Sequence, residues 1–298
     1  MIIEVPLGAP RVSLRHLDPD GRAGDVVGHL IAADADRIVV LPEDKPAVWM
    51  RRSNVKNLKR VPERTVLPAS PPDAIQRMLG HTWPGLRTAR LGGWVLRAGN
   101  GRTSRANSTL VGGDPGMPWD EAVKLADEWR GKPVTLQVVL DDPVIAKAEA
   151  VGYRLLSPTV VMVARSDDLP YDHVEVRTSE TPDEDWLAIW RGGQSDDELI
   201  AELTSAPAVY AQIPGVAVGR VAMDGPWAVI SSVEVVPELR GAGWGRAMTR
   251  ALVDAVESRF VALQVEQDNR IARSLYAKEG FVEHHTYAYL FPPDYVTG

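Results

Sequence analysis

The chain contains no cysteine, and this absence removes several kinds of chemistry. Without thiols the protein cannot form a disulfide, a thiolate zinc site or a cysteine nucleophile. Long apolar runs are missing as well, because no window approaches the roughly 18 uninterrupted apolar residues of a membrane helix. The first residues, Met1-Ile-Ile-Glu-Val-Pro6, show neither a basic segment nor a sustained apolar one. We therefore expect a cytoplasmic protein that does not contact a membrane.

Positive charge is also scarce. The chain has 33 Lys and Arg against 40 Asp and Glu, which gives a formal net charge of −7 and a pI near 5.5. Binding of nucleic acid needs a surplus of Lys and Arg to neutralise phosphates, so the composition argues against it and favours a cationic substrate. The basic segment 51–60 is a local exception, and it reads either as a basic patch or as a solvated strand end.

A length of 298 residues predicts two or three compact units. In the first unit, turn sequences such as Asp18-Pro-Asp-Gly21 separate short β-rich runs at hairpin spacing. An SH3-like β-barrel over residues 1–64 is the economical fit. A proline-rich linker, residues 61–72, follows and predicts a domain boundary near residue 65. The expected barrel strands are residues 11–15, 26–31, 37–41 and 47–50.

Beyond the linker the chain repeats itself after about 127 residues. The segment Leu136-Gln-Val-Val-Leu-Asp-Asp142 is matched by Leu263-Gln-Val-Glu-Gln-Asp-Asn269, and in each copy a helix, a glycine with an aromatic residue, and a strand follow. An amphipathic helix precedes each copy, at residues 119–130 and 244–259. We therefore predict an α/β (α+β) fold of two similar halves with mixed central sheets. Their expected bounds are residues 65–170 and 171–298.

The strongest local signal lies in the second half. Residues 229–236 form an unbroken β-rich run, as in a buried strand, and Pro237 ends its pairing. Three alternate glycines, at positions 241, 243 and 245, then open a helix with an apolar face. Glycines let backbone amides approach a ligand closely, and a helix N-terminus adds partial positive charge. The segment therefore predicts a cradle for a pyrophosphate group.

A dinucleotide and coenzyme A both present pyrophosphate in this way. A dinucleotide fingerprint requires Gly-x-Gly-x-x-Gly, whereas here the third glycine comes one residue early, although Glu266 stands where a ribose ligand would be expected. Only 53 residues follow Gly245, too few for a full doubly wound sheet. Coenzyme A fits better. A dinucleotide-dependent oxidoreductase and a strand-turn-helix with purely structural glycines remain as alternatives.

The same segment resembles the GCN5-related N-acetyltransferase (GNAT) superfamily. The pyrophosphate signature of that family, Arg/Gln-x-x-Gly-x-Gly/Ala, is met by Arg240, Gly243 and Gly245. A second family element, Asn followed seven residues later by Tyr in a helix that ends Gly-Phe, is met by Asn269 and Tyr276. The two motifs stand in the family's order and spacing.

The resemblance covers residues 171–298, and the internal repeat extends a degenerate copy back to about residue 68. An SH3-like domain before a GNAT region is similar to actinobacterial proteins, some of which are described as histone acetyltransferase-like. The first half lacks the cradle, because acidic residues within 111–121 would repel pyrophosphate at its helix N-terminus. We expect that half to complete the fold and to wall the acceptor pocket. Its candidate lining residues, together with one from the second half, are Trp94, Arg105, Asn107 and Trp190.

The resemblance implies acetyl-CoA as cosubstrate and no metal. Backbone groups of the strand before the glycine loop would hold pantetheine and polarise the thioester carbonyl. Asn269 would contact the pantetheine arm. Tyr276 would protonate the departing thiolate, or would only pack against the cofactor. The implied cofactor-binding residues are Val233, Glu234, Val235, Arg240, Gly241, Ala242, Gly243, Trp244, Gly245, Arg246, Asn269 and Tyr276.

The general base is left open, because Gln264 stands where some relatives carry a catalytic glutamate. Glu234 lies on the strand that would hold the thioester, and Glu266 lies on the same strand face as Gln264. Either carboxylate could deprotonate an ammonium group directly or through water, and we favour Glu234. A structural role explains both glutamates equally well.

The leading hypothesis is an N-acetyltransferase in which an amine attacks bound acetyl-CoA directly in a ternary complex. The acceptor would be a protein lysine, a protein N-terminus or a small amine. A non-catalytic acetyl-CoA sensor that signals through the SH3-like barrel is the second hypothesis, and the barrel is also the candidate surface for contacts with another protein.

Overall fold

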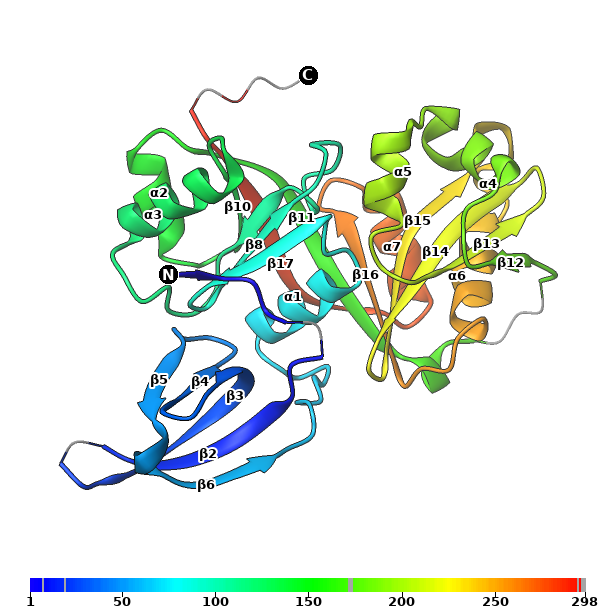
Figure 1. The fold of residues 1–298 in the computed structure, drawn as a ribbon. Coiled ribbons are helices and arrows are strands. Elements are labelled where there is room, and N and C mark those ends of the chain that lie inside the picture. Colours follow the sequence, from blue (N-terminus) through cyan, green and yellow to red (C-terminus); the bar gives the residue numbers. More distant parts are fainter. Residues whose placement is uncertain (7, 19, 171–173, 294, 296–298) are drawn as a thin grey trace.

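The computed structural model describes the chain except for residues 7, 19, 171–173, 294 and 296–298. Within the described residues the chain forms one sheet of five strands and one of twelve, and helices lie on both faces of the larger sheet (Figure 1). The predicted α/β fold with mixed sheets is confirmed. None of the described helices is long and apolar enough to cross a membrane.

The small sheet has the strand order β5-β4-β3-β2-β6. Its core consists of alternating apolar residues such as Leu14, which is fully buried, and Val40. The basic segment forms an edge strand paired with β2, and its lysines and arginines suit an edge that must not pair with another chain. The strands are β2 (Arg11–Leu17), β3 (Ala23–Ala33), β4 (Arg37–Leu41), β5 (Val48–Arg51) and β6 (Val55–Arg60), with a 3-10 turn, η1 (Arg52–Asn54), before β6.

The small sheet is packed against the first half of the large one. The Asp44 carbonyl oxygen in the β4–β5 loop accepts a hydrogen bond from the Asp114 amide at 2.8 Å. The linker is also held, because the Trp227 Nε1 donates to the Val66 carbonyl oxygen at 2.7 Å. The first strand, β1 (Ile2–Ile3), pairs with the large sheet instead of the small one. Contacts therefore cross the boundary predicted near residue 65.

The large sheet has the order β1-β7-β8-β9-β10-β17-β11-β16-β15-β14-β13-β12. The elements of the first half are α1 (Pro72–His81), β7 (Arg87–Leu91), β8 (Trp94–Ala98), β9 (Ser108–Leu110), α2 (Trp119–Arg130), β10 (Thr135–Val139), α3 (Val144–Ala150) and β11 (Arg154–Arg165). Those of the second half are η2 (Ser166–Asp168), β12 (Arg177–Ser179), α4 (Glu184–Ile189), η3 (Trp190–Gly193), α5 (Asp197–Leu203), β13 (Val209–Ile213), β14 (Ala217–Asp224), β15 (Trp227–Val235), η4 (Pro237–Leu239), α6 (Trp244–Asp254), β16 (Phe260–Glu266), α7 (Arg270–Lys278) and β17 (Val282–Phe291).

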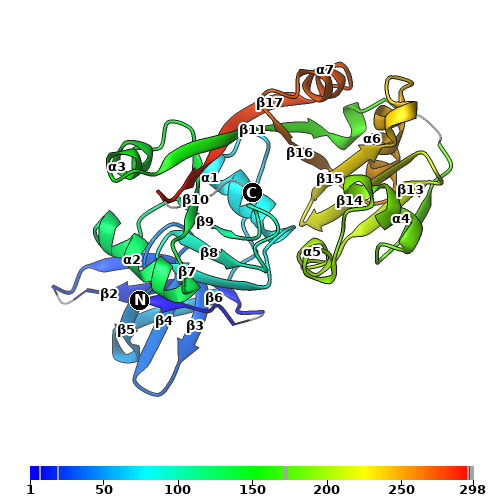
Figure 2. The same ribbon diagram turned by 90° about the horizontal axis from the view of Figure 1, so that it is seen from above.

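The internal repeat is visible in the sheet. The pairs β9–β10 and β15–β16 are both parallel, and a helix links the strands of each pair. The last strands of the two halves have changed places: β17 pairs with β10 and β11, and β11 pairs with β16 (Figure 2). The two expected sheets are therefore one continuous sheet, in which neither half leaves a free edge at the junction.

Opposite faces of the large sheet carry different helices. On β15, Ile230 packs in the core under α6, whereas Val229 packs with α1 residues such as Met78 on the other face. Val218 of β14 packs with α4 and α5 on the same side as α1. We call this the α1 face. Because side chains alternate along a strand, Gln264 and Glu266 also lie on the α1 face.

Candidate functional site

Strands β15 and β16 separate within the sheet. Their pairing runs from Trp227 opposite Phe260 to Ile230 opposite Leu263, and beyond this point β15 pairs only with β14. A register shift in the β14–β15 ladder accompanies a positive φ of 56° at Ser232. Such a bulge increases the local twist of a strand and bends it. The bulge thus accounts for an opening between residues 231–235 and 264–266.

The glycine loop follows this opening. Gly241 and Gly243 have φ values of 81° and 93°, which L-residues with a side chain adopt only with strain. A Cβ on Gly241 would meet nothing within 4 Å, and one on Gly243 only the Arg246 Nη2 at 3.7 Å. Backbone conformation, not packing, therefore requires these glycines. The space beside them is open.

The N-terminus of α6 faces the loop and is suited to an anion. Within the described residues no side chain caps the helix, and its first turn holds no acidic residue. The Arg246 guanidinium lies close to Gly243, and the Arg240 Nε donates to the Val235 carbonyl oxygen at 3.1 Å. Uncapped amides, the helix dipole and the Arg246 cation therefore lie together at this helix N-terminus, and Arg240 lies in the loop that leads to it. The helix ends at Asp254, so its predicted end at residue 259 is wrong; residues 255–259 form the connection to β16, which begins at Phe260.

Tyr276 lies beside α6. Its ring packs edge-on against Phe281 with centroids 5.7 Å apart. Burial raises the pKa of the Tyr276 hydroxyl, and a hydrogen bond with Thr249 of α6 opposes this. Asn269 serves as N-cap of α7: its Oδ1 accepts from the Ala272 amide at 3.0 Å. A contact of Asn269 with pantetheine stays a prediction.

Glu234 lies on the part of β15 that has left β16. Its carboxylate accepts from the Arg191 backbone amide at 2.8 Å. Burial raises the pKa of Glu234, while that bond and the charges of Arg191 and Arg240 lower it. A raised pKa brings a carboxylate closer to the range in which a general base works at neutral pH.

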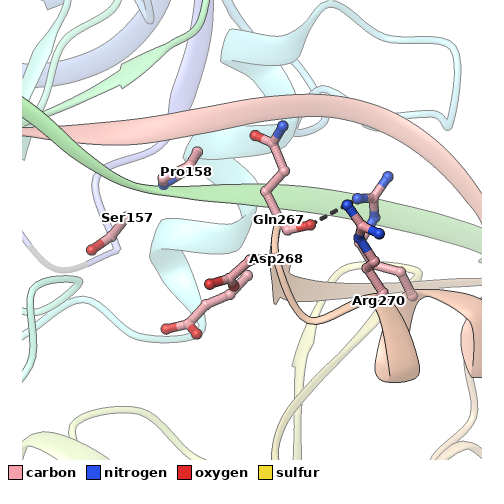
Figure 3. A pocket seen from close by; sticks show the side chains of 7 residues that line it. Ser157, Pro158, Gln267, Asp268 and Arg270 are labelled. Atoms are coloured by element: carbon pink, nitrogen blue, oxygen red, sulfur yellow. Dashed lines mark hydrogen bonds between the residues drawn. The ribbon is translucent and has the colours of Figure 1, made fainter.

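Glu266 stands on the other side of the opening, at the end of β16, and is exposed. It lines a cavity of about 620 Å³. Figure 3 shows Ser157 and Pro158 of β11 on one side of this cavity and Asp268 on the other. No hydrogen bond or ion pair among the described residues joins Glu234, Glu266 and Tyr276. The cavity is lined by Ser157, Pro158, Glu266, Gln267, Asp268, Arg270 and Arg273.

The four lining candidates of the acceptor pocket separate into two groups. Trp94 is 1% exposed in the core of the first half. Trp190 packs on Trp186 with ring centroids 5.5 Å apart. The Asn107 Nδ2 is buried and donates to Glu202 at 2.7 Å. Only Arg105 of the four is partly exposed.

Other residues of the α1 face were not predicted as functional. Trp83, Arg220 and Tyr287 gather around Arg105, next to Gln264. They come from the end of α1 and from β14 and β17, and only the exchange of the last strands brings β17 to this place. No local sequence signal indicates such a cluster.

Comparisons with known proteins find acetyltransferases among the relatives of this chain. A family described as "Probable histone acetyltransferase Rv0428c C-terminal" matches residues 74–290. The "Probable histone acetyltransferase Rv0428c" of Mycobacterium tuberculosis is 25% identical over 291 residues, which are 94% of this chain and 94% of that protein. The "Uncharacterized N-acetyltransferase YobR" of Bacillus subtilis is 25% identical over 238 residues, 71% of this chain and 96% of that protein.

Solved structures show the same fold. A GCN5-related N-acetyltransferase from Kribbella flavida superposes with a TM-score of 0.53 at 17% identity. The match covers 75% of this chain and 96% of that one. The tandem α/β region is thus the fold of that superfamily.

Proposed function

This chain belongs to the family of the Rv0428c C-terminal region, within the GNAT superfamily, and from this premise we propose that it transfers an acetyl group from acetyl-CoA to an amine. The observation that carries the proposal is the separation of β15 from β16 directly before an uncapped helix N-terminus. The separated strands offer unpaired backbone groups to a ligand, and the N-terminus of α6 offers backbone amides to an anion.

The residues at this place fit coenzyme A. The loop 240–246 would hold the pyrophosphate through backbone amides, with Arg240 and Arg246 as counter-charges. A Cβ on Gly245 would lie 3.7 Å from Leu275 and 3.9 Å from Val235, so the bare glycine leaves room where the helix meets the strand. Backbone groups of Val233, Glu234 and Val235 would hold pantetheine and the acetyl carbonyl.

Acetyl-CoA supplies an acetyl group already activated as a thioester. Tyr276 donates its phenolic proton to the sulfur as the C–S bond breaks, and its raised pKa keeps the hydroxyl protonated at neutral pH. Glu234 accepts a proton from the acceptor ammonium, so that the free amine can attack the carbonyl carbon, and later releases that proton to solvent; Glu266 is the second candidate for this step. The further proton that the nitrogen loses as the C–N bond forms passes through water to the Tyr276 phenolate and restores its hydroxyl. The products are an amide and the free thiol of coenzyme A.

The proposal is tested by thiol release. Purified protein is mixed with acetyl-CoA and a panel of amines, and free thiol is measured against samples that lack protein or amine. We expect release that depends on one class of amine. Stabilisation against heat by acetyl-CoA without thiol release would favour a sensor instead, and stabilisation by a nicotinamide dinucleotide alone would favour the oxidoreductase.

A further inference from the structure

Two arginines enclose one tryptophan where the two halves meet. The Trp83 ring, 6% exposed, lies directly after α1. The guanidinium carbon of Arg105, from the loop of the first half, is 5.5 Å from the ring centroid, and that of Arg220, from β14, is 4.9 Å away. Two positive charges therefore lie close together on the α1 face.

In the described part of the chain, neither guanidinium has a counter-ion. Within the described residues no carboxylate forms an ion pair with Arg105 or Arg220. Burial lowers the pKa of the Arg105 guanidinium, but its interactions with the hydroxyls of Tyr287 and Tyr289 raise that pKa by more, so the net shift is upward. The donors of Arg220 reach two hydroxyls and two carbonyl oxygens, those of Tyr210, Ser231, Thr82 and Ala206. Cations shielded from water without an anion are costly, so the arrangement favours binding of one.

The buried carboxylate of Glu202, which contacts the loop before Arg105, is already occupied. Glu202 is 0% exposed and accepts from the Thr103 hydroxyl at 2.7 Å and from the Asn107 side chain at 2.7 Å. It also accepts from the amides of Arg102 and Thr103. Glu202 thus fixes the loop that carries Arg105 and has no remaining bond to offer its guanidinium.

Three donors of this cluster also lack a hydrogen-bond partner. The Arg105 Nε, the Trp83 Nε1 and the Gln264 Nε2 are each shielded from water and have no acceptor within the described residues. Buried polar groups in native proteins nearly always have partners, so unpaired ones that are all donors point to an absent acceptor. Arg105 is the one member of the group Trp83, Arg105, Arg220 and Tyr287 that is partly exposed.

The cluster leads to the opening between β15 and β16 from both sides. Gln264 directly follows the last paired residue of β16, and its Oε1 accepts from the Tyr287 hydroxyl at 2.8 Å. Tyr287 in turn contacts Arg105. On the other side, Ser231 directly follows the last paired residue of β15 and accepts from Arg220 at 3.4 Å. The two cations thus flank the base of the opening.

We infer that the acceptor amine carries a carboxylate, which binds at Arg105, with Arg220 and Trp83 beside it. This inference rests on the proposed acetyl transfer at the same opening. A guanidinium recognises a carboxylate through two parallel hydrogen bonds. The unpaired Trp83 Nε1 and Gln264 Nε2 could donate further hydrogen bonds to the same carboxylate. The substrate class is therefore an amino acid, or a peptide with an acidic group near its amine, instead of a polyamine. Arg105 sets specificity and takes no part in the chemistry.

Matched amines test the inference. L-phenylalanine, L-phenylalaninamide and 2-phenylethylamine share one skeleton, and only the first carries a carboxylate; rates are compared per fraction of free amine, because the ammonium pKa differs among the three. A second series is made from leucine. A peptide with N-terminal aspartate is compared with the same peptide carrying asparagine. We expect kcat/KM to be at least about tenfold higher for the carboxylate member of the preferred series. Arg105→Gln should bring the ratio close to one, mainly through KM, and Arg105→Lys should keep part of it.

A control variant separates recognition from general stacking. Arg87 also lies over a tryptophan, 4.8 Å from the Trp129 ring, but on the exposed side of β7. Arg87→Gln should leave the amine preference unchanged. If Arg105→Gln does not fold, as judged by thermal unfolding, Tyr287→Phe removes one partner of Arg105 and should lower the preference about threefold.

A second measurement does not depend on turnover. Calorimetry in the presence of coenzyme A compares binding of N-acetyl amino acids with binding of their amides, for the wild type and Arg105→Gln. Carboxylate-selective binding that the variant loses supports the inference even if no amine is acetylated, and in that case only the proposed function fails. Acetylation of amides and carboxylates at equal rates, or an unchanged preference in Arg105→Gln, overturns the inference and leaves the transferase intact.

Discussion

The two halves contain the same order of strand, loop, helix and strand, but the two parallel strands separate in the second half and stay paired in the first. In the first half β9 and β10 stay paired up to the loop, because the Val111 amide still donates to the Gln137 carbonyl oxygen at 2.9 Å. In the second half pairing ends at Ile230 and Leu263 while both strands continue. The topology is shared, so it cannot by itself create a ligand site.

The loop before α2 is also closed to a ligand, whereas the glycine loop before α6 is open. A Cβ on Gly113 of the first half would clash with the Asp44 carbonyl oxygen from the small sheet, whereas one on Gly241 would meet nothing. Helix α2 carries Asp120 and Glu121 in its first turn, and α6 carries no acid there. The first loop thus binds part of its own chain. The difference teaches that a few local features decide which copy of a repeated fold can hold an anion.

Gly243→Asp should break the comparison most strongly, because it gives the second loop an acid like that of the first. The side chain forces an L-residue into a φ of 93°, which costs roughly 1–2 kcal/mol, and its charge repels phosphate. We expect acetyl-CoA affinity to fall by about 10³-fold or more, as measured by calorimetry.

Gly21→Asp is the matched control for this variant. It introduces the same charge at a similar φ of 78°, in a turn of the small sheet where a Cβ meets nothing. It should bind acetyl-CoA like the wild type. Unchanged affinity in folded Gly243→Asp would remove the anion cradle from the proposed function.

Tyr276→Phe tests the difference between the halves at α7, the helix that corresponds to α3 of the first half. Tyr276 stands four residues before Gly280, and the first half has buried Ala148 at the same distance from Gly152. If the hydroxyl is the general acid, its loss should lower saturated turnover by about 10²–10⁴ while the acetyl-CoA dissociation constant changes little. Turnover within about threefold of the wild type would show that Tyr276 only packs against the cofactor.

Local features were predictable from the sequence. The bounds of α2 and β4 agree with the predicted residues 119–130 and 37–41, because amphipathic periodicity and flanking turn residues decide them. The glycine loop before α6 was recognisable for the same reason. Its binding and catalytic roles, like the domain boundaries and the SH3-like assignment of the small sheet, stay predictions.

Long-range pairing was not predictable. Strand β11 is apolar enough to pair with either β10 or β16, and the choice depends on competition between whole strands. Strand β6 was not among the predicted barrel strands, because its charged residues indicated only a basic patch or a solvated strand end. The cluster around Trp83 draws on separate segments, so its members are distant in sequence and no spacing reveals them.

The smallest expected effect concerns His285, whose contact with Gln76 joins the two halves. It lies on β17, and its Nε2 is 2.8 Å from the Gln76 Nε2 of α1. The Gln76 Oε1 accepts from Gln137, so the amide nitrogen of Gln76 faces the ring and donates to it. The Nε2 of His285 must therefore carry no proton, and the ring is neutral. Burial, helped by the charge of neighbouring His284, lowers the pKa of His285 from 6.5 to about 4.

This shift makes the coupling of the halves sensitive to acid. The unfolded chain takes up a proton near pH 6.5 and the folded chain only near pH 4, so stability is complete above 6.5 and is lost as the pH falls through that window. The full shift corresponds to about 3 kcal/mol, and partial exposure of the ring reduces this to roughly 1–2 kcal/mol. Urea unfolding at pH 7.5 and pH 5 should show the loss in the wild type and a smaller one in His285→Gln, whereas His16→Gln, in the small sheet, should behave like the wild type. Equal losses in all three proteins would mean that His285 does not report on the junction, and that the two halves resist acid by other contacts.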